Sequence, residues 1–277
     1  RWERELSGNA DPIRVLNPIA SPLSVMRSSL IGSLVNTLRY NLARKAPRVR
    51  LFEVGRVFRR DASAVDGPLG VAGVTQPMRV AGLACGPVDA SQWGSKERTV
   101  DFFDIKGDVQ ALFSPRTVTF APSEHPALHP GRTARIVRGG VAVGWLGALH
   151  PKLADMLDIP DALYLFELDW AAVRDIALPV PGGVSEFPSS RRDLAFVVDE
   201  SVAAGALAEV VRDAAGPLLM SLQTFDVYRG TGLPPGRKSI AFGLMASYAL
   251  IVYGFDVPGG WFWQHTVDHT EVLDVGI

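Results

Sequence analysis

A short segment rich in proline and glycine, residues 178–184, constrains the fold most, because it divides the 277-residue chain into two parts. It reads Leu-Pro-Val-Pro-Gly-Gly-Val. Its prolines make the backbone stiff and its glycines make it flexible, as in linkers between domains. The sequence predicts a first domain over residues 1–177, a linker over 178–184, a second domain over 185–246 and a tail over 247–277.

The first part predicts a mostly antiparallel sheet with helices packed on it. Leucines that recur at three- and four-residue steps predict a helix over residues 22–44, which Pro47 ends. Alternation over residues 49–59 predicts a strand whose more apolar face carries Phe52 and Val54. Further apolar runs predict strands over residues 78–85, 118–121, 134–137, 141–149 and 163–168, and a helix over 102–112. This pattern is typical of an α+β fold.

The second part predicts a ferredoxin-like unit that is incomplete. A strand over residues 193–198, a helix over 203–214 and strands over 218–228 and 239–246 form the first two-thirds of a βαββαβ arrangement. The last helix and edge strand are not evident, because Pro258, Gly259 and Gly260 break any helix. The tail holds four acidic residues and no lysine or arginine. We expect an atypical, non-native replacement that leaves one sheet edge open, with Trp261 and Trp263 covering part of the exposed face.

Composition and spacing exclude several other classes of protein. The single cysteine, Cys85, excludes an internal disulfide and a Cys-rich zinc site and favours a cytoplasmic location. The uncharged residues 239–255 are too few for a membrane helix, which needs about 20 apolar residues, so a buried strand is expected there. His125, His129 and His150 are each followed by proline, which favours turn-forming histidines over zinc ligands.

Basic residues in the second part indicate a surface for nucleic acid. Arg191 and Arg192 offer forked donors suited to phosphate, and Asp193 could hold one of them in place. The pair Arg237-Lys238 follows a later loop. The basic clusters are expected to converge at one end of the sheet. The alternative is a solvated basic turn that is ion-paired to its neighbouring aspartate.

An aromatic residue beside a cation gives a second indication of RNA binding. A base could stack on Tyr228 while Arg229 contacts a phosphate. Strand alternation predicts Phe225 and Val227 on one face and Asp226 and Tyr228 on the other. The alternative is a tyrosine packed at the edge of the sheet.

Five blocks of sequence in a fixed order carry a resemblance to a known family. They read Leu51-Phe-Glu-Val-Gly-Arg-Val-Phe-Arg-Arg60, Asp101-Phe-Phe-Asp-Ile-Lys-Gly-Asp108, His129-Pro-Gly-Arg132, Phe187-Pro-Ser-Ser-Arg-Arg-Asp-Leu194 and Phe225-Asp-Val-Tyr-Arg-Gly230. From about Asn17 to Phe242 the chain resembles the C-terminal third of the beta subunit of bacterial phenylalanyl-tRNA synthetases. The resemblance implies a non-catalytic class II synthetase-like core and a ferredoxin-fold anticodon-binding domain.

The resemblance also implies a role within an α2β2 enzyme. In that enzyme the alpha subunit activates phenylalanine with ATP and Mg²⁺, the beta core supports assembly, and the last domain holds tRNA(Phe). No catalytic residue, metal site or cofactor is then expected in this chain. The expected tRNA contacts are Arg191, Arg192, Asp193, Tyr228, Arg229 and Lys238. Because the last domain is incomplete, tRNA binding is expected to be weak or absent.

The long predicted helix is expected to lie at the interface with the alpha subunit. The residues expected at this interface are Arg27, Leu30, Leu34, Leu38 and Asn41. Glu53 is expected to pair with Arg27 or Arg39 rather than to bind a metal.

Two other functions stay open at the level of sequence. One is a self-contained enzyme that adenylates a small acid on a class II-like core. The other is a degenerate pair of domains that serves only structure or partner binding.

Overall fold

A computed structural model describes residues 2–68, 70–159, 162–174, 189–247, 265–267 and 270–274. The chain folds into two compact units, Arg1–Pro179 and Val180–Ile277. The predicted linker, residues 178–184, lies outside the described residues. The fold class is α+β with mostly antiparallel sheets, which confirms the prediction from sequence.

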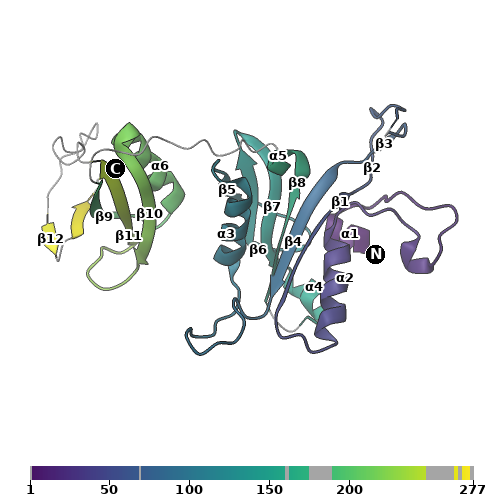
Figure 1. The fold of residues 1–277 in the computed structure, drawn as a ribbon, viewed down its shortest axis with the longest axis horizontal. Helices are drawn as coiled ribbons and strands as arrows, with labels where there is room; N and C mark the ends of the chain where they lie inside the picture. Colours follow the sequence, from purple (N-terminus) through teal and green to yellow (C-terminus); the bar gives the residue numbers. More distant parts are fainter. Residues whose placement is uncertain are drawn as a thin grey trace. The chain divides into compact units, whose positions relative to one another are not determined.

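The first unit is built on a six-stranded antiparallel sheet in the order β1-β4-β8-β7-β6-β5 (Figure 1). Its strands are β1 (Val49–Arg56), β4 (Met78–Cys85), β5 (Thr119–Pro122), β6 (Leu128–Arg138), β7 (Val141–Leu149) and β8 (Leu163–Asp169). A short pair, β2 (Arg59–Arg60) and β3 (Val74–Thr75), forms a separate ribbon. The predicted strands are therefore present, although most begin or end a few residues away from the prediction.

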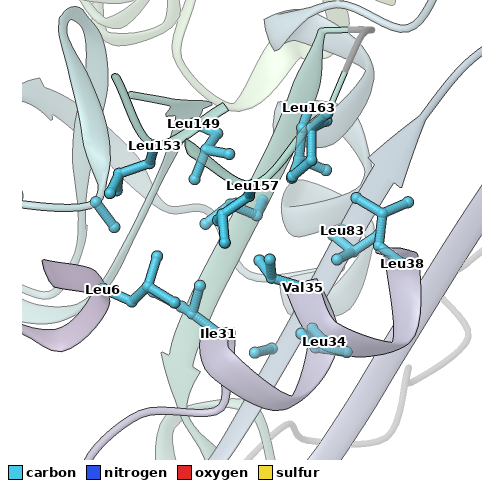
Figure 2. Packing of buried hydrophobic residues seen from close by; sticks show 14 of the residues in the cluster. Leu6, Ile31, Leu34, Val35, Leu38, Leu83, Leu149, Leu153, Leu157 and Leu163 are labelled. Atoms are coloured by element: carbon cyan, nitrogen blue, oxygen red, sulfur yellow. The ribbon is translucent and has the colours of Figure 1, made fainter. Parts of the chain in front are cut away.

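Helices cover both faces of this sheet. On one face, α1 (Trp2–Ser7), α2 (Ile31–Leu42) and α4 (Pro151–Met156) enclose a core in which Leu38 and Leu163 are almost completely buried (Figure 2). On the other face, α3 (Phe102–Phe113) and α5 (Trp170–Arg174) enclose a second core around Phe113 and Phe166. Neighbouring β8 residues contribute to opposite cores, as strand geometry requires.

Helix α2 is shorter than the sequence predicted. It begins at Ile31, and the earlier residues form only a 3₁₀ turn, η1 (Ser21–Leu23). The backbone that follows η1 is hydrogen-bonded to an earlier segment instead. Val15 N donates to Ser24 O (3.0 Å), and Met26 N donates to Ile13 O (2.8 Å). Residues 24–26 are therefore paired across with residues 13–15 and do not add turns to the helix.

The face of β1 that was predicted to be the more apolar one is the exposed one. Phe52 is 79% exposed and Val54 is 41% exposed, whereas Leu51 packs against the core beneath α2. The physical reason is helix coverage, since α2 contacts β1 and α3 contacts β7 and β8. Counting apolar residues on each face cannot show which face an edge strand buries.

The second unit begins with the predicted strand–helix–strand–strand order. Its elements are β9 (Ser189–Asp199), α6 (Ala204–Ala215), η2 (Gly216–Leu218), β10 (Leu219–Tyr228) and β11 (Arg237–Ser247). The strands lie in the order β10-β11-β9, and all pairs are antiparallel. Helix α6 covers one face through a core that includes Phe196 and Phe242. Residues 239–247 are thus part of a strand, as expected, and Trp261 and Trp263 lie outside the described residues.

The tail adds two strands in an arrangement that the sequence did not predict. Strand β13 (Thr270–Asp274) pairs with β9, and β12 (His265–Val267) pairs with β13. The β9 edge that was expected to be open is therefore paired. However, β13 runs parallel to β9. A helix-linked fourth strand of a βαββαβ unit would run parallel to β11 and hence antiparallel to β9. The tail therefore pairs with the edge of β9 in a different strand direction from that of a βαββαβ unit.

We predict that Leu38→Ala lowers the free energy of unfolding of the first unit by about 2–5 kcal/mol, because it empties a fully buried site. Leu16→Ala, at a position that is 97% exposed, should change it by less than about 0.5 kcal/mol. Urea unfolding followed by tryptophan fluorescence measures both. Equal effects of the two variants would contradict the packing of α2 described above.

Candidate nucleic-acid interface

The candidate interface is the face of the second sheet that α6 does not cover. On this face Gly243 contributes no side chain. A Cβ atom at Gly243 would lie 3.3 Å from Asp193 Oδ1, 3.6 Å from Arg191 Nη2 and 3.7 Å from Phe225 Cδ1. An aromatic ring, a guanidinium and a carboxylate therefore surround one point where the chain has no side chain.

A β-bulge brings Phe225 to this face and makes the prediction from alternation wrong. Thr224 lies opposite Phe242 and Asp226 lies opposite Ala241, so Phe225 has no partner on β11. The extra residue breaks the two-residue period. Phe225, which is 49% exposed, therefore lies on the open face. Asp226 lies there too, because it pairs with Ala241 from the same face as Gly243.

Tyr228 also lies on the open face and is held over the turn that follows. Its hydroxyl donates to Thr231 O at 3.1 Å, and 45% of the residue is exposed. A Cβ at position 230 would approach Tyr228 Oη to 2.5 Å, so a larger residue there would displace the Tyr228 ring. The hydrogen bond orients the ring while part of it stays accessible.

The two arginines of the basic motif point to opposite faces. Arg191 shares the open face with Asp193, whose carboxylate accepts from Arg191 Nε at 3.1 Å and from Nη2 at 3.4 Å. Arg192 has the same strand parity as the core residue Leu194. Its side chain therefore lies on the α6 side of the sheet, where it is exposed. The two cannot form one phosphate clamp.

Glu200 engages the other predicted cations. Its carboxylate accepts from Arg229 Nε at 2.7 Å, and its carbonyl oxygen accepts from Lys238 Nζ, also at 2.7 Å. Lys238 is only 8% exposed, whereas the Arg229 side chain is 56% exposed. Of the predicted tRNA contacts, Lys238 is therefore the one that this structure does not present to solvent.

The basic clusters do not converge, and that expectation was wrong. Arg191 lies opposite Met245, whereas Arg237 lies opposite Asp199. Positions 191 and 199 of β9 are separated by about 26 Å at a rise of about 3.3 Å per residue. The antiparallel hairpin places Arg229 and Arg237 at the end of β9, away from its start. The open face therefore has one cation-bearing site at each end.

The arrangement around Gly243 suits single-stranded nucleic acid. Bases stack on aromatic rings such as Phe225, and an arginine held by a carboxylate presents its remaining donors to phosphate. Asp193 and Asp226 limit the positive charge of the face. We therefore expect contacts from stacking and a few phosphates rather than from a strongly basic surface.

In the first unit, the residues predicted at a subunit interface take structural roles. Leu30, Leu34 and Leu38 are at most 5% exposed and pack onto the unit's own sheet, so these side chains form no stripe for a partner. Asn41 Nδ2 donates to Thr37 O within α2 at 2.8 Å. Arg27 pairs with Glu53, which confirms Glu53 as a structural partner.

The three histidines form turns, as predicted. Each Nδ1 accepts a backbone N–H two residues later, at 3.2 Å in His125, 3.0 Å in His129 and 3.2 Å in His150. His125 also stacks on Trp145 at 4.1 Å, and burial lowers its pKa to about 4. Within the described residues, no three His, Cys, Asp or Glu side chains gather as a metal site.

Sequence reasoning missed the buried acid Glu167, which is 2% exposed. Its Oε2 accepts from Ser29 Oγ at 2.5 Å and from Leu30 N at 2.9 Å, directly before α2. Burial raises its pKa, although the two hydrogen bonds oppose the shift. Two features of the sequence point to this contact: an acidic residue in an otherwise apolar strand, and serines just before a helix.

Comparison with known proteins identifies both units. The family model described as "Phenylalanyl tRNA synthetase beta chain CLM domain" matches residues 1–170. A second model, "Ferredoxin-fold anticodon binding domain", matches residues 185–248. The chain belongs to the phenylalanyl-tRNA synthetase beta chain family. In the described part, no helix combines the length and apolar character needed to cross a membrane.

Curated relatives of this synthetase family match most of the chain. They carry the name phenylalanine–tRNA ligase beta subunit. The protein from Burkholderia pseudomallei is 50% identical over 250 residues, that from Cupriavidus pinatubonensis 50% over 251, and that from Bordetella pertussis 47% over 251. Each alignment covers 87% of this chain and 31% of the relative, so the chain spans about a third of their length.

We predict that stability depends on pH through Glu167. Its folded pKa lies above its ordinary value of 4.5. The folded state therefore holds this proton more tightly, and the stability it contributes is full below pH 4.5 and lost as pH rises through the folded pKa. Glu167→Gln keeps an acceptor and cannot ionise, so its stability relative to the parent chain should rise as the pH increases above about 4.5.

Unfolding free energies of both chains across this pH range test the prediction, with Glu209→Gln on the exposed side of α6 as control. A difference between Glu167→Gln and the parent chain that stays constant with pH would show that Glu167 does not titrate as described.

Proposed function

We propose that this chain acts as part of a phenylalanine–tRNA ligase beta subunit. It assembles with an alpha subunit through its first unit and holds tRNA(Phe) on its second unit during phenylalanylation. The observation that carries the proposal is the order of the two matches, with the beta-chain domain followed by the anticodon-binding domain. The names of the relatives support the same assignment.

The geometry of the open face supports the tRNA-binding part. Beside Gly243, a base would stack on Phe225 and its phosphate would bind Arg191. Tyr228 and Arg229 would contact the strand further along. Asp193 orients Arg191, and Lys238 positions Glu200 rather than touching RNA. Arg192 would serve only at the rim, because it lies on the other face.

ATP and Mg²⁺ are assigned to the complete enzyme and its alpha subunit. The described residues do not fit a magnesium site, since no three acidic or histidine side chains gather among them. The buried carboxylate of Glu167 is used by Ser29 and Leu30. We assign this chain a role in binding and assembly.

We predict that Arg191→Ala weakens tRNA(Phe) binding and lowers the slope of log affinity against log salt concentration by about 1, because one phosphate contact is lost. Arg212→Ala removes the same charge from the exposed side of α6 and should leave both quantities unchanged. Fluorescence anisotropy at several salt concentrations measures them. Equal losses in the two variants would indicate non-specific attraction and would remove the open face from the proposal.

We predict that replacing residues 249–277 with the ending of the Burkholderia pseudomallei relative strengthens tRNA binding. The anticodon-binding match stops at residue 248, and β13 runs parallel to β9 where a helix-linked strand would run antiparallel. The comparison is made at one fixed salt concentration. Equal, salt-sensitive affinities of the two chains would show that the present tail already builds a working domain.

A further inference from the structure

The end of helix α2 lies in a stretch of sequence that has cations and no acids. Residues 12–52 contain no aspartate or glutamate, yet they contain the cations Arg14, Arg27, Arg39, Arg44, Lys45, Arg48 and Arg50. Two of these pair with acids from outside the stretch, because Arg27 binds Glu53 and Arg50 binds Asp108. Four others follow one another closely where α2 ends. We call these four residues the basic end of α2: Arg39, Arg44, Lys45 and Arg48.

Backbone hydrogen bonds hold this segment against the last turn of the helix. Helix α2 ends at Leu42, and Lys45 N donates to Leu42 O at 2.8 Å. Ala46 N donates to Asn41 O at 3.2 Å, and Lys45 has a left-handed backbone angle (φ 61°) in this turn. The carbonyl groups at the end of a helix carry partial negative charge, which favours cations there. The cations are therefore gathered by an ordered turn.

Within the described residues, no carboxylate forms an ion pair with the basic end of α2. Arg39 Nε donates to Leu157 O at 2.9 Å, and Arg48 Nε donates to Val88 O at 3.1 Å. Both acceptors are backbone carbonyls, which carry no formal charge. Each acceptor residue is followed by an aspartate in the sequence, but neither aspartate pairs with these arginines. The basic end therefore keeps its positive charge.

An exposed aromatic ring supports one of these cations. The Arg44 guanidinium lies over the Tyr40 ring, with Cζ 3.3 Å from the ring centroid, and its Nη1 donates to Tyr40 O at 3.0 Å. Tyr40 is 59% exposed, and Arg44 is exposed too. Arg44 thus presents a flat, charged plane that is held from behind. A nucleic-acid base can stack on such a plane while neighbouring cations contact phosphates.

We propose that the basic end of α2 binds the phosphate backbone of RNA, with one base stacked on Arg44. This is a second RNA contact on a different unit from the open face, and it rests on the proposed function in taking tRNA as the RNA. The open face differs, because carboxylates engage Arg191 and Arg229 there. A membrane is a poorer partner, since the leucines of α2 are buried and offer no apolar face for insertion. An acidic protein has no base for the stack.

The test measures tRNA(Phe) binding to the full chain by fluorescence anisotropy at several salt concentrations. The variant Arg44→Ala/Lys45→Asn should keep the turn, because asparagine tolerates a left-handed backbone angle. The slope of log affinity against log salt concentration should fall by about 1.4–1.8, because two phosphate contacts are lost. At about 0.1 M salt the affinity should fall at least about tenfold.

The matched control is Arg174→Ala/Arg212→Ala, which removes the same charge. Both arginines are exposed and lie in the last turns of α5 and α6. This control should leave the slope and the affinity unchanged. Circular dichroism should show the same fold in every variant. A slope change in the control equal to that of Arg44→Ala/Lys45→Asn would show non-specific attraction and would overturn the proposal.

The variant Tyr40→Leu tests the stacked base separately from the charge. It keeps all four cations, so the salt slope should stay the same. The affinity should fall at least about fivefold, because the Arg44 plane loses the ring that supports it. An affinity equal to that of the parent chain would contradict the stacking part of the proposal.

Arg191→Ala, measured in parallel, separates this inference from the proposed function. If Arg191→Ala weakens binding and Arg44→Ala/Lys45→Asn binds like the parent chain, the open face stands and the basic end is not an RNA site. If only Arg44→Ala/Lys45→Asn weakens binding, the inference stands and the open face fails. If poly-glutamate binds the parent chain as tightly as tRNA(Phe) and this variant abolishes that binding, the basic end takes acidic protein segments, which overturns the proposal.

Discussion

The first unit depends on the buried contact between the Glu167 carboxylate and the residues that precede α2. Ser29 and Leu30 donate to a strand residue that lies 138 and 137 positions away in the sequence. A carboxylate with so little access to water is stable only with such donors, and the start of a helix has free N–H groups to offer. The contact therefore fixes where α2 begins. It ties the start of this helix to β8, and Leu30, Leu34 and Leu38 face inward.

Local pattern predicted much of this fold, and long-range contacts decided the rest. The strands of the first sheet and strands β9, β10 and β11 of the second follow from apolar runs, and the histidine turns follow from the prolines after them. The start of α2 was not predictable, because Glu167 is remote in sequence. Phe52 looked like a core residue, but an edge strand is buried only where a helix covers it. At the candidate site, Tyr228 was placed on the correct face, whereas the bulge at Phe225 left no signal in the alternation.

Charge in the second unit is mostly balanced by its own residues. The Asp193 carboxylate holds Arg191 and the Glu200 carboxylate holds Arg229, whereas Lys238 is buried and donates to the Glu200 carbonyl oxygen. A count of basic residues therefore overstates the charge available to a ligand. What remains is the positioning of a few groups, with the ring of Phe225 and the guanidinium of Arg191 meeting where Gly243 leaves space. Such a face depends on shape and stacking more than on net charge, consistent with a chain whose formal charge is −1.

The bulge also affects the solubility of the chain. Strand β10 is the outermost strand on its side of the sheet, and most of its ten residues are exposed, including Met220, Phe225 and Val227. A regular edge of this length and composition would invite pairing with other copies and growth into aggregates. Register shifts between Leu219 and Ser221 and between Thr224 and Asp226 interrupt it. Because bulges bend and twist a strand, a second copy meets no long straight edge. The irregularity that turns the Phe225 ring toward Gly243 therefore also opposes edge-to-edge pairing of copies.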